Sequence, residues 1–451
     1  MLDFPQTIPV RDIEQTSGAY DANKIGKHSA LYVGGDCFRD RIDEFLIRRP
    51  SECSTNPAGR DNYAARKRRA PYINRAGGLI DWFVASVFRI EPMFICDPAL
   101  PQSSIDYWTG LNRNADGLGT PLPALARRAL KEVMLNLRSY FQVIFPQQSV
   151  SPADPSSADA TLDVISAIEA DDWCEDGAGR LEWLRSHNVR GVEHSEFWAK
   201  SDDQVHSWTY YDEEAIAVYE AVKRHGQWAD QAAVLTEYMT HEFGLPVFEI
   251  RAGHGQWVME RIADVVIALF NRDASVCKYL DDSAFQVLAI STQKQLDQIV
   301  AQDLMALSLE PGDSVRFLAP ENGFYGPLSG DQDRLKQALY EVVQASAINA
   351  MATQTQNARQ SAKAKQIDRD PLQVLLASFA WPVRDALERA KDQLAEFRNE
   401  APDAIHLAGM DEFTETLADA REFITGGGMN GETEAGDDDD TDGDGDDGGE
   451  D

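Results

Sequence analysis

The sequence predicts an α+β fold that is mainly α-helical, on the strength of three observations. In several long segments apolar residues recur at three- and four-residue steps, the period of an amphipathic helix. Between residues 163 and 250, short aromatic and β-branched segments are separated by Asp, Gly and Ser, which predicts a small antiparallel sheet. Residues 431–451 carry 12 acidic residues and no basic one, a composition that predicts a disordered tail.

The helical period is present in six segments. These are residues 79–88, 121–145, 257–280, 331–351, 367–397 and 411–424. The 367–397 segment is predicted to be one strong helix or a helix pair broken at Trp381-Pro382, because proline cannot donate a backbone hydrogen bond within a helix. The Gly34-Gly35-Asp36 run and residues 51–59 predict loops.

Seven segments are predicted to be strands. Five belong to the small sheet and its end, at residues 163–170, 190–200, 205–211, 215–222 and 245–250, and two stand apart at 285–290 and 315–318. The last two lie between long predicted helices, so they form a small insert rather than part of the main sheet.

The net charge of the chain excludes one class of nucleic-acid-binding protein. The 451 residues contain 42 Lys and Arg against 75 Asp and Glu, a formal charge of -33. Without the tail, 63 acidic residues face the same 42 basic ones, so the first 430 residues still carry -21. Such a charge excludes a simple basic protein that holds nucleic acid by releasing counterions. A hydrophobic content of 43% predicts that most of the chain folds.

The cysteines and the ends of the chain indicate a compartment. Five widely spaced Cys contain no CxxC pair, which favours a reducing cytoplasm over a disulfide scaffold. The N-terminus has no signal-peptide pattern and no apolar stretch is long enough to span a bilayer, so a soluble protein is expected.

Catalytic signatures are missing from the sequence. There is no phosphate-binding P-loop and no Gly-x-Ser-x-Gly elbow, and Gly253-His254-Gly255 lacks the third glycine of a nucleotide fingerprint. The acid pairs Asp171-Asp172, Asp202-Asp203 and Asp281-Asp282 could supply a two-metal site, although adjacent loop acids are usually solvated. The sequence therefore predicts no catalytic residue, no metal and no cofactor.

One basic cluster, Arg66-Lys67-Arg68-Arg69, has two readings. It could contact the phosphates of nucleic acid, or it could form an exposed helix face and an ion-pair partner for an acidic surface. In a chain this acidic the second reading is favoured.

The order of the elements resembles the portal, or head–tail connector, proteins of tailed bacteriophages. The resemblance covers roughly residues 62–398 and rests on four blocks: Tyr63-x-x-Arg66 to Ala70-x-Tyr72-x-Asn74 with the helix ending Val87-Phe88-Arg89-Ile90-Glu91-Pro92; Asn114-Ala115-Asp116-Gly117-Leu118-Gly119; Gly244-Leu245-Pro246-Val247; and Gln360-Ser361-Ala362-Lys363-Ala364-Lys365-Gln366-x-Asp368. The chain departs from the family at Pro146-Gln147-Gln148, where Val-Asp-x-Pro is frequent, and at Ala362, which replaces a glycine. It resembles a divergent member.

The resemblance implies a subunit with a wing, long stem helices, a small α/β clip and a helical crown. The implied parts are an N-terminal arm and wing (1–258, helical and then antiparallel β), a first stem helix (259–282), the clip (283–328), a second stem helix (329–352), a channel or tunnel loop (353–366), the wing return and crown helices (367–425) and the disordered acidic tail (426–451).

It also implies a function, in which a ring of probable twelvefold symmetry sits at one capsid vertex of the virion. Such a ring passes double-stranded DNA during packaging and ejection, without sequence specificity, and docks the large terminase, the head–tail adaptor and the major capsid protein. Assembly would take place in the host cytoplasm. Residues expected to line the channel are Asp331, Asp333, Lys336, Glu341, Thr353, Gln354, Thr355, Gln356 and Asn357. Residues expected to form subunit contacts on the stem are Val258, Ile262, Val265, Val266, Leu269 and Phe270.

Two other classes remain open from the sequence. One is a metal-dependent DNA-processing enzyme that uses the paired carboxylates. The other is an acidic scaffold or chaperone whose tail mimics DNA.

Overall fold

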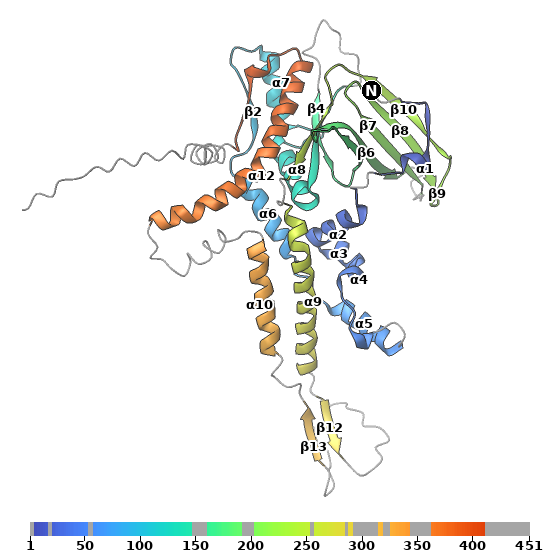
Figure 1. Cartoon of the computed structure of the whole chain (residues 1–451), viewed down its shortest axis with the longest axis vertical. Helices are drawn as coiled ribbons and strands as arrows, with labels where there is room; N and C mark the ends of the chain where they lie inside the picture. Colours follow the sequence, from blue (N-terminus) through green and yellow to red (C-terminus); the bar gives the residue numbers. More distant parts are fainter. Residues whose placement is uncertain are drawn as a thin grey trace, which may run out of the picture.

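The computed structural model describes residues 4–16, 20–52, 57–146, 160–191, 203–252, 257–284, 287–291, 314–318, 325–342 and 362–410. These residues form an elongated molecule with most helices and sheets gathered at one end (Figure 1). We call that end the body. A helix pair with two strands at its tip, which we call the stalk, extends from the body. The predicted α+β class is confirmed. The structure contains more β-sheet than the mainly helical fold that the sequence predicts.

Short helices make up the N-terminal part of the body. They are α1 (Val10–Ile13), α2 (Ala22–Val33), α3 (Gly35–Asp40), α4 (Ile42–Phe45), the 3-10 turn η1 (Pro50–Glu52), α5 (Pro57–Arg69), α6 (Arg75–Val87) and α7 (Gln102–Arg113). The loop prediction is therefore wrong at Gly35, Asp36 and residues 57–59, which are helical, and at residues 51 and 52, which lie in η1. Residues 53–56 lie outside the described part of the chain. Gly34, with φ of +67°, makes the sharp turn that lets α3 follow α2 directly.

The helix predicted over 121–145 ends earlier than expected. Helix α8 spans Leu122–Asn136, and residues Arg138–Ile144 form strand β3. Leu137 stands between them with φ of +77°, a left-handed conformation that a helix cannot continue through. Beyond it, pairing of β3 with two other strands overrides the helical period of the sequence.

The main sheet has seven antiparallel strands, with order β1-β10-β8-β7-β6-β5 and β9 paired to β8. Its strands are β1 (Thr7–Pro9), β5 (Ala170–Glu175), β6 (Leu181–Gly191), β7 (Gln204–Tyr211), β8 (Ala215–Arg224), β9 (Gln227–Trp228) and β10 (Ala232–Thr240). The predicted strands at 205–211 and 215–222 are confirmed, and the two described residues of the strand predicted at 190–200 are the last two of β6. Residues 192–200 lie outside the described part of the chain.

Two smaller sheets and one long helix complete the body. Strands β11 (Val247–Arg251), β3 and β4 (Thr161–Ser166) form one sheet, and β14 (Ile405–Ala408) pairs with β2 (Met93–Cys96), next to the 3-10 turn η4 (Pro402–Ala404). Helix α12 (Ala362–Phe397) runs through Trp381-Pro382, so the predicted break is wrong. The buried neighbours Ala380 and Val383 hold this part of the helix in the core and offset the hydrogen bond lost at the proline.

The stalk consists of α9 (Val258–Ala284), β12 (Val287–Ser291), β13 (Ser314–Leu318) and α10 (Tyr325–Val342). Strands β12 and β13 pair in antiparallel fashion, and α9 and α10 lie side by side above them (Figure 1). The predicted long helix after Trp257 and the two isolated strands are confirmed. With 27 residues, α9 is about 40 Å long, which sets the reach of the stalk.

Candidate functional site

The stalk is the candidate functional site, and its first helix is anchored in the body. Val258, Ile262, Val266, Leu269 and Phe270 are at most 5% exposed and belong to the main core of the chain. Val265, the sixth residue of the predicted subunit contact, is partly buried against the same core. Five of the six residues are therefore buried within one chain, and Val265 keeps part of its side chain exposed. Contact of this stripe with a second subunit stays a prediction.

Polar groups fasten the N-terminal helices to the next turns of α9. The side-chain amide of Asn271 donates to the carbonyl of Phe45 (2.9 Å), and its oxygen accepts from the backbone N–H of Ile47 (3.0 Å). One turn on, the hydroxyl of Ser275 accepts from the guanidinium of Arg49 (3.2 Å). The segment between α4 and η1 is thus held along α9.

Asp273 links three helices and was missed by the sequence reasoning. Its side chain is 6% exposed; it accepts from Arg75 of α6 (2.8 Å) and from Gln332 of α10 (2.7 Å). Burying a carboxylate is costly unless charged and polar partners satisfy it, and here both oxygens are satisfied. An acid three and four residues after Phe270 and Leu269, on the same helix face, is the sequence signal that could have revealed it.

The α9–α10 contact also contains an exposed ion pair. Arg272 donates to Asp331 at 2.5 Å, and Arg334 donates to the same carboxylate at 2.9 Å. These hydrogen bonds, from Arg334 first and Arg272 second, lower the pKa of Asp331 below its usual value. Leu335 and the buried Leu339 add an apolar strip to this contact.

The predicted channel residues on α10 do not share one face. Asp331 points toward α9, whereas Asp333, two residues on, lies about 200° around the helix. Asp333 has a side chain that is 69% exposed and pairs with Lys336 (2.8 Å). Glu341, also exposed, accepts from Gln337 (3.1 Å). Around the helix it lies about 80° from both Asp331 and Asp333, so Asp333 and Lys336 share one outward side and Glu341 lies next to it. Thr353, Gln354, Thr355, Gln356 and Asn357 lie outside the described residues.

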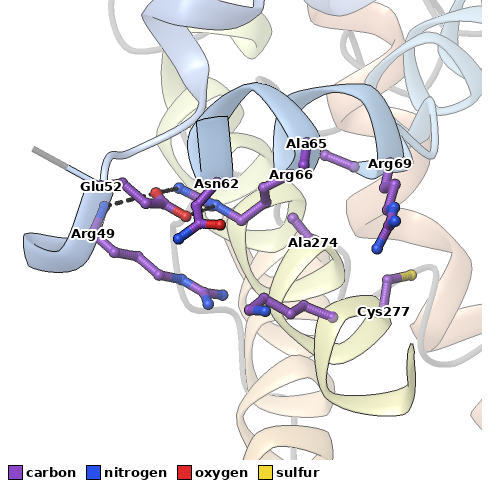
Figure 2. Close-up of a pocket in the computed structure, with 10 residues that line it drawn as sticks. Arg49, Glu52, Asn62, Ala65, Arg66, Arg69, Ala274 and Cys277 are labelled. Atoms are coloured by element: carbon purple, nitrogen blue, oxygen red, sulfur yellow. Dashed lines mark hydrogen bonds and ion pairs between the residues drawn. The ribbon is translucent and has the colours of Figure 1, made fainter. Parts of the chain in front are cut away.

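Two residues of the basic cluster in α5, Arg66 and Lys67, form ion pairs with acidic residues of the same chain. Arg66 is buried and donates two hydrogen bonds to Glu52, at 2.8 and 2.6 Å (Figure 2). Burial alone raises the pKa of Glu52, but the hydrogen bonds from Arg66 bring it below its usual value. Lys67 pairs with Asp43 at 2.7 Å. The ion-pair interpretation is confirmed for Arg66 and Lys67.

The acid pairs show no metal centre within the described residues. Asp171 is buried against Arg185 (2.7 Å), and Asp172 lies 3.5 Å from the same guanidinium. Asp202 and the side chains of Asp281 and Asp282 lie outside the described part. In the part of the chain that the structure describes, no three His, Cys, Asp or Glu side chains are grouped so that they could hold a metal ion.

A search for helices that could cross a bilayer, made over the described residues, finds none that is both long and apolar enough.

No protein-family model matches the chain, and no curated protein matches it. Among solved structures it is similar to a chain from the virion of a native gene transfer agent particle, at 16% identity and a TM-score of 0.40, covering 80% of this chain and 88% of that one. It is also similar to chains from the neck of the empty particle (C6 symmetry; 15% identity, TM-score 0.41, 79% and 87% covered) and of the native particle (C12 symmetry; 14%, 0.38, 80% and 88%). Similarity at this level does not assign a function to this chain.

Proposed function

We propose that the chain is a portal subunit: copies of it form a ring, of twelve on the family resemblance, that conducts double-stranded DNA. The observation that carries the proposal is the stalk. Two long helices leave the body side by side and end in a two-stranded unit, so one chain provides a thick end and a narrow projecting end (Figure 1). Such a tapered subunit suits head-to-tail packing about an axis, with the stalks gathered around a channel.

The outward face of α10 supports a channel that does not hold DNA. Its exposed charged side chains are those of Asp333, Arg334, Lys336 and Glu341, two acids and two bases. Both bases are already paired with acids of the same helix, Arg334 with Asp331 and Lys336 with Asp333. Lysines and arginines that neutralise phosphates would bind the duplex and slow its passage. A polar face whose cations are already paired with acids weakens such contacts, so it is the face that we place toward the channel.

The tip of the stalk is the proposed clip. In the resemblance, this part contacts the large terminase during packaging and the head–tail adaptor afterwards. The paired strands β12 and β13 supply a rigid frame for such contacts, while the body takes the place beside the major capsid protein. The proposal includes these partners, a location in the virion and assembly in the host cytoplasm. It also includes the absence of a catalytic role.

The ring is tested by the mass of the purified particle. A ring of twelve chains of 50.1 kDa would weigh about 600 kDa and show a central hole in negative stain. A particle smaller than about 150 kDa at micromolar concentration would contradict the ring.

The channel face is tested separately with Asp333→Arg. We expect this substitution to leave assembly intact and to reduce the amount of DNA packaged, because a cation now faces the phosphates. Asp392→Arg is the matched control, since Asp392 is an exposed acid that also lies beside a lysine, on α12 of the body. Normal packaging by Asp333→Arg would place this face away from the channel.

A further inference from the structure

A pocket of about 340 Å³ lies where α2, the end of α8 and the start of α9 meet the sheets of the body (Figure 1). Among the described residues, four aromatic side chains line it: Tyr20, Tyr140, Trp173 and Trp257. An apolar cavity of ~150 Å³ can take up a benzene ring, so this pocket has room for two fused rings. The portal proposal assigns no role to it.

The charged side chains that line the pocket already have partners. Among the described residues they are Asp21, Lys24 and Arg138. Lys24 pairs with Glu260 at 2.7 Å, and Arg138 pairs with Glu175, also at 2.7 Å. Asp21 accepts a hydrogen bond from the backbone N–H of Lys24 (2.9 Å) and so caps α2. Since each of these groups is held, and burying a further unpaired charge is costly, the pocket fits an uncharged ligand.

Two indole rings form flat walls of the pocket. Trp257 donates a hydrogen bond from Nε1 to the carbonyl of Leu135 (2.9 Å), and the ammonium of Lys24 lies 4.4 Å from the centre of its ring. The guanidinium of Arg138 lies 4.6 Å from the centre of the Trp173 ring. These contacts hold both indoles in place, and flat aromatic surfaces pack well against a planar partner.

Asn136, the last residue of α8, lines the pocket and contributes an unused acceptor. It is 7% exposed, and its Nδ2 donates to a carboxylate oxygen of Glu132 (3.2 Å). Because a carboxylate can only accept, this bond fixes which end of the amide is the nitrogen. No described residue donates to Oδ1 at the other end. A buried carbonyl without a donor is costly, and an N–H group in the pocket would supply one.

Tyr140 lines the same pocket and contributes an unused donor. Its side chain is 0% exposed, and its hydroxyl has no hydrogen-bond partner among the described residues. The guanidinium of Arg138 lies near this hydroxyl, but it carries only donors and cannot accept the phenolic proton. Glu249, opposite Tyr140 in the pairing of β11 with β3, does not accept it either. A carbonyl oxygen in the pocket would supply the missing acceptor.

We infer that this pocket binds an uncharged planar molecule of the lactam class, in which an N–H and a C=O lie side by side on a ring. The N–H donates to Oδ1 of Asn136, the C=O accepts from the hydroxyl of Tyr140, and the ring lies against the indoles. Both protein atoms are closed to solvent in the unliganded fold, so side chains in front of them move as the ligand enters. The inference does not depend on the proposed portal function, because every residue of the pocket belongs to one chain.

The test is a titration of the natural full-length chain followed by ligand-observed NMR. Three probes of the same bicyclic shape are used: the lactam carbostyril, N-methylcarbostyril, which lacks the N–H, and quinoline, which lacks both the N–H and the carbonyl. We expect carbostyril to bind with a Kd below about 1 mM, and the other two to bind at least about fivefold more weakly. Absence of saturable carbostyril binding, or equal binding of all three probes, would overturn the inference.

Tyr140→Phe locates the donor. It removes a hydroxyl whose proton has no acceptor, so it should move the thermal midpoint by no more than about 2 °C while weakening carbostyril binding about fivefold. The matched control is Tyr211→Phe, since Tyr211 is a buried tyrosine of the same small core that does not line the pocket. Carbostyril binding should change by less than about twofold in the control. Equal binding by the two variants would place the ligand away from Tyr140 and overturn the assignment.

Asn136→Leu locates the acceptor through a change in preference. This variant should bind carbostyril and N-methylcarbostyril within about twofold of each other, because the group that distinguishes them is gone. Quinoline should bind it as it binds the natural chain, which shows that the pocket is still formed. A folded variant that kept the fivefold preference for carbostyril would exclude Asn136 as the acceptor and overturn the inference.

Discussion

The first half of α9 lies among apolar side chains, whereas its second half is surrounded by charged and polar groups. Up to Phe270 the helix packs in the main core, and from Asn271 onward it is joined to its neighbours through hydrogen bonds and ion pairs that involve Asp273 and Arg272. The exposure of Leu280, at 49%, marks how little apolar packing remains there. In this one continuous helix, apolar burial therefore stabilises the first half, and polar and charged contacts hold the second half.

The difference matters for the proposed portal subunit, which would have to assemble. Salt does not screen apolar burial as it screens exposed ion pairs, so the body should persist at ionic strengths that alter the stalk. Exposed ion pairs contribute little and are screened, so the stalk can change its contacts without unfolding the body.

The largest expected effect is that of Phe270→Ala. The ring of Phe270 is 1% exposed and lies 4.9 Å from the ring of Phe38, in an edge-on arrangement. Removing it leaves a cavity in the core and should lower the free energy of unfolding by about 3–5 kcal/mol. Urea unfolding followed by tryptophan fluorescence measures the change.

Leu280→Ala, in the second half of the same helix, is the control. Its effect should stay within about 0.5 kcal/mol, because the side chain is half-exposed. Similar losses for the two substitutions would show that the two halves of α9 do not differ as described.

An intermediate effect is expected from mild acid, and it should fall on the body. His187 and His206 are neighbours in the main sheet, with Nε2 of the first 2.9 Å from Nδ1 of the second. Burial, followed by the charge of Arg185 for His187 and of His187 for His206, lowers the pKa of each to about 4. The folded pair thus stays neutral while the unfolded chain takes up protons below its ordinary pKa of 6.5. The stability that this difference provides is complete above pH 6.5 and is lost as the pH falls toward 4.

We expect a loss of about 2 kcal/mol for each of the two histidines between pH 7 and pH 4.5, measured as the change in urea unfolding. A chain with both His187→Gln and His206→Gln should lose less over this range, and His406→Gln, on exposed β14, should behave as the natural chain does. The α9–α10 contact should be unaffected in the same range, because the pKa of Asp331 is lowered and its carboxylate remains charged. A double variant as acid-sensitive as the natural chain would exclude the histidines as the cause.

The smallest expected effect is that of Arg272→Ala. Arg272 is about half-exposed in its pair with Asp331, so its loss should move the thermal midpoint of the whole chain by no more than about 1 °C. Hydrogen exchange in α10 should nevertheless rise about two- to fivefold at low salt, since the pair joins α10 to α9. Exchange in the main sheet serves as the internal reference, and no increase in α10 would leave the pair without a role in the stalk.

Part of the fold could be predicted because its signals are local. The three- and four-residue spacing from Val258 to Phe270 indicates a helix with one apolar face, and two short apolar runs with turn residues between them indicate the pair β12 and β13. The helical content of the N-terminal region was partly missed because α3 and α4 have only 6 and 4 residues, and α5, which begins at Pro57, has almost no apolar period.

The candidate site was predicted less well, for a related reason. Asp331 and Asp333 look equivalent in the sequence, but one faces α9 and the other faces outward, which depends on where α10 lies. The stripe Val258 to Phe270 packs in the body, and its contact with a second subunit stays a prediction. A helical period identifies an apolar face without identifying what covers it.

The sequence by itself determined the acidic balance of the chain, the long helix after Trp257 and the acidic composition of residues 431–451, since these depend only on residue identity and spacing. Only the tertiary structure decided that Arg66 is paired with Glu52 and that Asp273 joins three helices. It also decided that Arg49 and Lys278 line the same pocket. These contacts join residues from 14 to more than 200 positions apart. Coulomb and hydrogen-bond energies depend on distance in space, which the chain order does not contain.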